Sequence, residues 1–142
     1  MKRNYPALII AAAQHDMRPR CARRALRPER LRAVLIVGCA IFIGVALHLG
    51  DPVAYARADP DLARLLRAMA LIKGAIAIAA VAAVFWRAGW EVSKPVAASY
   101  LLGCWVLAGS AALIWQLAYI ASAAIAFHAA ALALLLVAWR EG

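Results

Sequence analysis

Most of the last third of the sequence lacks Asp, Glu, Lys and Arg. From Val96 to Trp139 there are 44 consecutive residues without any of the four. One helix of that length would measure about 66 Å, roughly twice the hydrocarbon thickness of a bilayer. The run is also too long for a strand or a core helix of a soluble domain. This absence therefore excludes a soluble fold and predicts two membrane spans joined by a tight turn.

Motifs for catalysis and metal binding are also missing. The sequence contains no HExxH, no GxSxG and no phosphate-binding glycine loop, and its apolar segments hold no pair of carboxylates. Cys21, Cys39 and Cys104 form no CxxC pair, and their odd number argues against a disulfide framework or a structural zinc site. We therefore expect neither an enzyme activity nor a bound metal.

The chain is similar in size to the small four-span, proton-coupled drug exporters. Those proteins exchange protons for cations at a carboxylate embedded in the membrane. The apolar segments of this chain contain no Asp or Glu, so the resemblance in size does not extend to that function.

The residues that are present form four apolar segments in a chain of 142 residues, 67% of which are hydrophobic. This length leaves room for one domain. The sequence predicts an all-α fold, an integral membrane four-helix bundle in residues 33–139, preceded by a basic, partly disordered tail in residues 1–32. The expected spans are residues 33–50, 68–86, 96–117 and 119–139.

Local signals place some helix ends better than others. Asp59 can cap a helix, Pro60 suits the first helical position, and Asp61 favours the positive end of the helix dipole. They predict one helix from Pro60 to about Trp86, with its first two turns at the interface. No Gly or Pro marks the turn inside the 44-residue run. We place that turn near Gln116–Tyr119 because Trp, Gln and Tyr there are typical of a lipid–water boundary.

Nine of the 16 basic residues lie between Lys2 and Arg32. Such a cluster beside a span indicates a cytoplasmic N-terminus and contact with anionic lipid. It does not predict nucleic-acid binding, because no interleaved aromatic residues or binding fold accompany it. Arg87, Lys94 and Arg140 then fall inside as well, so both termini are expected to be cytoplasmic. The arginines expected to face lipid headgroups are Arg18, Arg20, Arg23, Arg24, Arg27, Arg30 and Arg32.

The start of the tail leaves two alternatives open. Ala7–Ala13 resembles a minimal secretion signal, although cleavage would leave an Arg-rich start on the translocated side. Translation from Met17 instead of Met1 is the other alternative.

Five polar residues in the spans are candidates for binding a ligand or a proton: His128, Lys73, Gln116, Tyr119 and His48. At 1.5 Å per residue, Lys73 lies about 7 Å, His128 about 13 Å and His48 about 3 Å below the outer boundary. Ionisable side chains in lipid are costly and often functional. Each also has a structural explanation: Lys73 can extend to the interface, His48 can end a helix, and His128 can bond to a neighbouring helix.

Ala- and Arg-rich composition is associated with GC-rich bacterial genomes, so we expect a protein of a bacterial inner membrane. The leading hypothesis is a non-enzymatic accessory or anchoring subunit, which forms a homo-oligomer or joins a larger complex. The alternative is a small carrier or a quinone- or anion-binding module that uses the five polar residues. No cofactor is expected. Haem b between His48 and His128 is disfavoured by a depth difference of about 10 Å. Lipid sensing by the basic tail is a third hypothesis.

Overall fold

The computed structural model describes residues 27–50, 59–90 and 92–141. Within them it contains four helices and no strand. The helices are α3 (Pro28–His48), α5 (Pro60–Arg87), α6 (Lys94–Trp115) and α7 (Ile120–Glu141). All four are long and apolar enough to cross a bilayer, with lengths from 21 to 28 residues. The predicted all-α, four-helix membrane fold is confirmed, and the chain is a multi-pass helical membrane protein.

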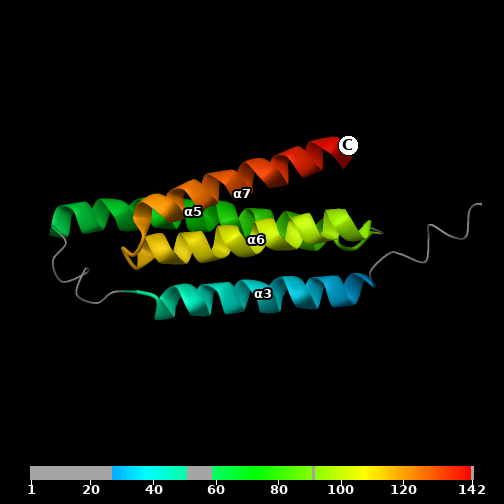
Figure 1. Cartoon of the computed structure of the whole chain (residues 1–142), viewed down its shortest axis with the longest axis horizontal. Coiled ribbons are helices and arrows are strands. Elements are labelled where there is room, and N and C mark those ends of the chain that lie inside the picture. The colour runs from blue at the N-terminus through cyan, green and yellow to red at the C-terminus, as the bar shows by residue number, and fades with distance from the viewer. Residues whose placement is uncertain (1–26, 51–58, 91, 142) are drawn as a thin grey trace, which may run out of the picture.

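Helix α6 is the centre of the arrangement (Figure 1). Helices α3, α5 and α7 each pack along α6, whereas the backbones of α3 and α5 approach each other only slightly and that of α7 packs closely on neither. In the apolar part of α6, 56% of the residues are buried, compared with 17% in each of the other three helices. The fold is therefore one enclosed helix with three helices around it, and most of the apolar surface of those three faces outward.

The molecule has two ends, which we call the Arg87 end and the Gln116 end. At the Arg87 end, α3 and α6 begin and α5 and α7 finish (Figure 1). At the Gln116 end, α3 finishes, α5 begins and the turn joins α6 to α7. Consecutive helices thus run in opposite directions, as short connections between long spans require.

The helix starts follow the proline signals in the sequence. Proline occupies one of the first two positions of α3, α5 and α6, where its missing N–H costs no helical hydrogen bond. Asp59 caps α5 as expected, because its side chain accepts a 2.9 Å hydrogen bond from the N–H of Asp61. Helix α3 begins at Pro28, five residues before the span expected from hydropathy, and α7 continues to Glu141. The helices therefore extend beyond the apolar segments at the Arg87 end.

The turn between α6 and α7 lies at the predicted place and is built by the backbone. Leu117 has φ of 57°, and its N–H donates to the carbonyl of Ile114 over 3.1 Å. The N–H of Ala118 donates to the carbonyl of Leu113, also over 3.1 Å. This pair of bonds is the Schellman motif, with leucine at the left-handed position where glycine is usual. The side chain of Leu117 is buried, so packing holds a conformation that the residue itself disfavours.

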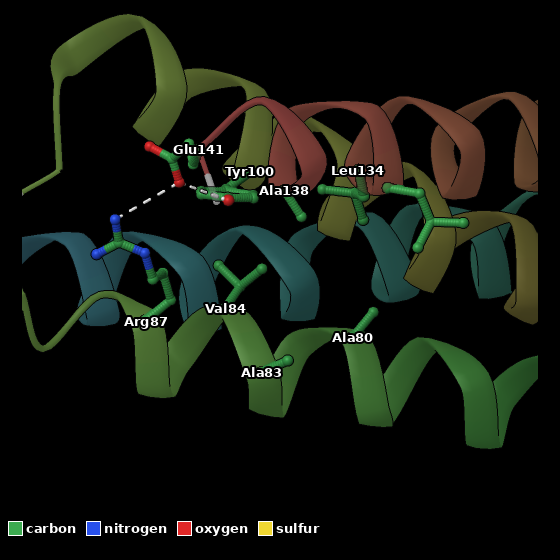
Figure 2. Close-up of a pocket in the computed structure, with 9 residues that line it drawn as sticks. Ala80, Ala83, Val84, Arg87, Tyr100, Leu134, Ala138 and Glu141 are labelled. Carbon is green, nitrogen blue, oxygen red and sulfur yellow. Dashed lines mark hydrogen bonds and ion pairs between the residues drawn. The ribbon is translucent and has the colours of Figure 1, made fainter.

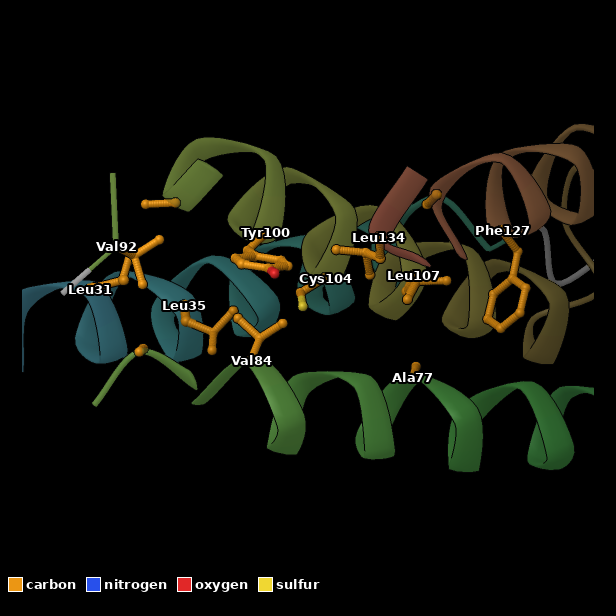
Figure 3. Close-up of a cluster of buried hydrophobic side chains, with 13 residues drawn as sticks. Leu31, Leu35, Ala77, Val84, Val92, Tyr100, Cys104, Leu107, Phe127 and Leu134 are labelled. Atoms are coloured by element: carbon orange, nitrogen blue, oxygen red, sulfur yellow. The ribbon is translucent and has the colours of Figure 1, made fainter. Parts of the chain in front are cut away.

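The core lies along α6 and includes Leu35, Cys104 and Leu107 (Figure 3). On the α3 side, the indole N–H of Trp105 donates to the carbonyl of Leu35 over 3.3 Å. The ring also lies directly against Gly38, where any Cβ would collide with it. On the α7 side, Leu134 fills the space above Gly103. Small residues therefore allow α6 to approach its neighbours closely.

Candidate functional site

The structure places Lys73 and His128 in different surroundings. The ammonium of half-buried Lys73 lies 4.5 Å from the centre of the Phe127 ring, a cation–π contact between α5 and α7. His128 follows Phe127 but is exposed, and its Nδ1 donates to the carbonyl of Ala124 over 2.7 Å. The imidazole thus bonds to its own helix rather than to Lys73 or a neighbouring helix.

The other three candidates lie at the Gln116 end. Gln116 is the C-cap of α6 and packs against Gly50, which follows α3. Tyr119 is 67% exposed and has φ of 49°. His48 is exposed in the last turn of α3. No hydrogen bond or ion pair joins any two of the five candidates, all of which the structure describes.

The two histidines also belong to helices on different sides of the fold. His48 is on α3 and His128 is on α7, and these helices pack on α6 rather than on each other. Both side chains are exposed. The geometry therefore adds no support for a haem held between them.

Among the tail arginines, Arg32 is half-buried and contacts α5. Its Nε donates to the carbonyl of Phe85 over 3.2 Å, and its guanidinium lies 4.7 Å from the centre of the Phe85 ring. Because α3 begins at Pro28, Arg32 is inside the helix and can reach α5. Arg27 and Arg30 are exposed at the start of α3. The other four lie outside the described residues: Arg18, Arg20, Arg23 and Arg24.

A polar cluster that the sequence analysis missed lies at the Arg87 end (Figure 2). The hydroxyl of Tyr100 in α6 donates to Oε2 of Glu141 over 2.7 Å. The same oxygen lies 3.6 Å from Nη2 of Arg87 in α5. Tyr100 is 6% exposed, so its hydroxyl needs a partner inside the protein. The cluster joins α5, α6 and α7 through one carboxylate oxygen.

Glu141 follows the last apolar segment, so hydropathy alone does not single it out. Its carboxylate nevertheless points toward Tyr100, since side chains on a helix tilt toward that helix's N-terminus. The predicted hairpin could have pointed to this cluster. It brings the start of α6 beside the end of α7, and Tyr100 is a hydroxyl-bearing residue near that start.

The Tyr100, Glu141 and Arg87 side chains border a cavity of about 430 Å³ between α5 and α7. Its remaining walls are apolar and include Ala83, Val84 and Leu134 (Figure 2). The backbones of α5 and α7 do not pack closely, so the cavity occupies the space between these two helices. The arrangement places a carboxylate, a guanidinium and a phenol at one end of an apolar pocket.

A second, larger hollow lies between α3 and α5. It measures about 820 Å³ and has an almost entirely apolar lining. Ile43 and Ile78 form part of its walls, and its floor on α6 includes the small residues Ala108, Ala111 and Ala112 beside Trp115. We call this hollow the α3–α5 groove.

Within residues 27–50, 59–90 and 92–141, no group of three His, Cys, Asp or Glu side chains could hold a metal ion. Comparison with protein-family models, with curated proteins and with solved structures gave no match to the chain. The class of the protein, a multi-pass helical membrane protein, therefore follows from its four helices.

Proposed function

We propose that the chain is an accessory or anchoring subunit of a bacterial inner membrane, which packs against itself or against a larger membrane complex. The α3–α5 groove carries the proposal. Helices α3 and α5 both pack on α6 but scarcely meet, which leaves a hollow lined on its α6 side by the small residues Ala108, Ala111 and Ala112. A floor of small residues permits close approach of another helix, and packing of this kind drives helix association in lipid.

The distribution of polar groups supports the same proposal. The five residues expected to form a binding site do not converge, and His128 is exposed on the outside of α7. A carrier needs polar groups that face a shared interior path. The geometry therefore favours a packing role over the alternative of a quinone or anion carrier that uses these five residues.

Photo-crosslinking tests the packing role. Ile78 lines the α3–α5 groove and Ile125 on α7 does not, yet both side chains are 72% exposed. A benzophenone amino acid replaces each of them separately in the full chain, in its native membrane. We expect discrete protein adducts from position 78 and only lipid adducts from position 125. Lipid adducts alone at both positions, with a monomer on native gels, would contradict the proposal.

The orientation is proposed from the charges. Arg32, Arg87, Lys94 and Arg140 all lie at the Arg87 end. Since basic residues favour the cytoplasmic side, this end and both termini are proposed to be cytoplasmic. A reporter fused after Gly142 should be active in the cytoplasm, and activity confined to the periplasm would reverse the orientation.

The carrier alternative has its own test. Replacement of Lys73 and His128 by Ala removes the cation–π contact and the imidazole together. If the chain is a packing subunit, the double variant keeps its partners and loses only stability. If it is a carrier that uses these residues, the folded variant keeps its partners and loses transport or ligand binding.

A further inference from the structure

We propose that the cavity between α5 and α7 binds a phospholipid whose headgroup carries both a phosphodiester and a primary ammonium, as in phosphatidylethanolamine. This inference is independent of the subunit proposal, because it concerns another face of the molecule. It rests on the position of the cavity in the membrane, on its shape and on the charges at its mouth.

The mouth of the cavity lies at headgroup depth. Three exposed tryptophans, Trp86, Trp90 and Trp139, gather at the Arg87 end. Tryptophan favours the interface between headgroups and hydrocarbon. Arg87 follows Trp86, and Glu141 lies two residues after Trp139, so both charged groups lie at the same level as this aromatic belt.

The apolar walls lead from that level into the hydrocarbon. They extend from Arg87 back to Ala80 on α5, and from Glu141 back to Leu134 on α7. Each distance is seven residues, or about 10 Å along the helix. A volume of about 430 Å³ in this direction suits an acyl chain rather than a compact polar solute. The occupant is therefore an amphiphile with its polar part at Arg87.

The charges at the mouth select a zwitterion. Arg87 and Glu141 lie 3.6 Å apart, and their side chains are 39% and 21% exposed. A headgroup with only a negative charge would be repelled by the carboxylate, and one with only a positive charge would be repelled by the guanidinium. A phosphodiester beside Arg87 and an ammonium beside Glu141 satisfy both groups.

The hydrogen bonds favour a primary ammonium. Oε2 of Glu141 is used by Tyr100 and Arg87, whereas Oε1 accepts no hydrogen bond from any residue that the structure describes. A primary ammonium can donate to this free oxygen, and a trimethylammonium has no N–H to donate. The hydrogen bond from Tyr100 holds the carboxylate of Glu141 in place, so Oε1 is already positioned when the lipid binds.

The test is a competition between lipids. The full chain is reconstituted in nanodiscs with equal parts of phosphatidylethanolamine, phosphatidylcholine and phosphatidylglycerol. It is then extracted in mild detergent, and the retained lipids are quantified by mass spectrometry. We expect phosphatidylethanolamine to be enriched about fivefold over the other two, the effect of one charge-assisted hydrogen bond at a partly exposed site. Equal retention of the three lipids would overturn the proposal.

Variants of the two charged residues separate their roles. Glu141→Gln should abolish the preference for phosphatidylethanolamine, and Arg87→Gln should lower the retention of all three phospholipids. The matched control is Arg64→Gln, which breaks the exposed pair of Arg64 with Asp61 at the opposite end and should change nothing. If Glu141 serves only to hold the helices together, Glu141→Gln lowers stability but leaves the lipid preference intact, and the proposal fails.

A second pair of variants tests the cavity without altering a charge. Ala83→Leu fills the cavity, whereas Ala82→Leu adds the same side chain to the α3–α5 groove. Only Ala83→Leu should reduce the retained phosphatidylethanolamine. Soluble glycerophosphoethanolamine, which has the headgroup but no acyl chain, should not displace the lipid. Displacement at equal concentration would show a headgroup site for a soluble ligand and overturn the assignment to a lipid.

Discussion

The two ends of the molecule form their polar contacts in different ways. At the Arg87 end, Arg32 bonds to Phe85 and Tyr100 bonds to Glu141, across 53 and 41 residues of sequence. In the half of the molecule nearer to the Gln116 end, the N–H of Asp61 bonds to Asp59 two residues away, and His128 bonds to Ala124 four residues away. Contacts between helices in that half include the cation–π contact of Lys73 with Phe127. The comparison shows hydrogen bonds between helices at the Arg87 end. In the other half, Asp61 and His128 bond within their own helix region, while Lys73 and Arg67 reach neighbouring helices through cation–π contacts.

The largest expected effect concerns close packing between helices. Gly38→Ala places a methyl group against the Trp105 ring and should lower the free energy of unfolding by about 2 kcal/mol. Gly44→Ala, six residues nearer to the Gln116 end, is the control because its Cβ meets nothing within 4 Å. It should be neutral or stabilising by about 0.5 kcal/mol, since alanine favours a helix. Unfolding in mixed micelles with increasing dodecyl sulfate measures both. Equal effects would show that the α3–α6 contact is looser than described.

A smaller effect is expected for the hydrogen bonds. Tyr100→Phe removes the bond between α6 and α7 and should cost about 1 kcal/mol, near the upper range for such bonds in membranes. Ser122→Ala removes a bond to the carbonyl of Tyr119, three residues away, and should cost less than about 0.5 kcal/mol. The same titration measures both variants. A larger loss for Ser122→Ala would reverse the comparison between the two ends.

Effects no larger than that of Tyr100→Phe, but of opposite sign for the two variants, are expected at the turn of the Gln116 end. Tyr119→Gly should stabilise the protein by up to about 1 kcal/mol, because Tyr119 has positive φ and an exposed side chain. Leu117→Gly relieves the same kind of strain but removes a buried side chain, so the net change should be a loss of about 1 kcal/mol. Thermal unfolding in detergent checks the opposite signs. Stabilisation by both substitutions would mean that packing does not hold Leu117.

The part of the fold that sequence reasoning predicted is the part that local chemistry determines. The charge-free run from Val96 to Trp139 gave the hairpin, and Asp59 with Pro60 gave the start of α5. The central position of α6 was not predicted, because all four segments are similarly apolar and their order around one another depends on side-chain fit. The fit of Gly38 to Trp105 is one example.

The candidate site was predicted less well for a related physical reason. The depth of a residue in the membrane can be counted along a helix from the sequence. This count identified Lys73 and His128 as candidates, because both lie within the hydrocarbon. Which neighbour a side chain faces depends on how the helices pack, and this cannot be derived from the sequence of one helix. His128, for example, is exposed and does not face another helix. Glu141 was not predicted as a site residue because it lies beyond the apolar segment. Its side chain nevertheless reaches back to Tyr100.

The central claim is that side chains from different helices are coupled at the Arg87 end. A double-mutant cycle with Tyr100→Phe and Glu141→Gln, measured by unfolding in mixed micelles, tests it most directly. We predict a coupling free energy of about 1 kcal/mol between the two residues, since each substitution removes one partner of the same hydrogen bond. Additive effects of the two substitutions, with no coupling beyond experimental error, would contradict the claim.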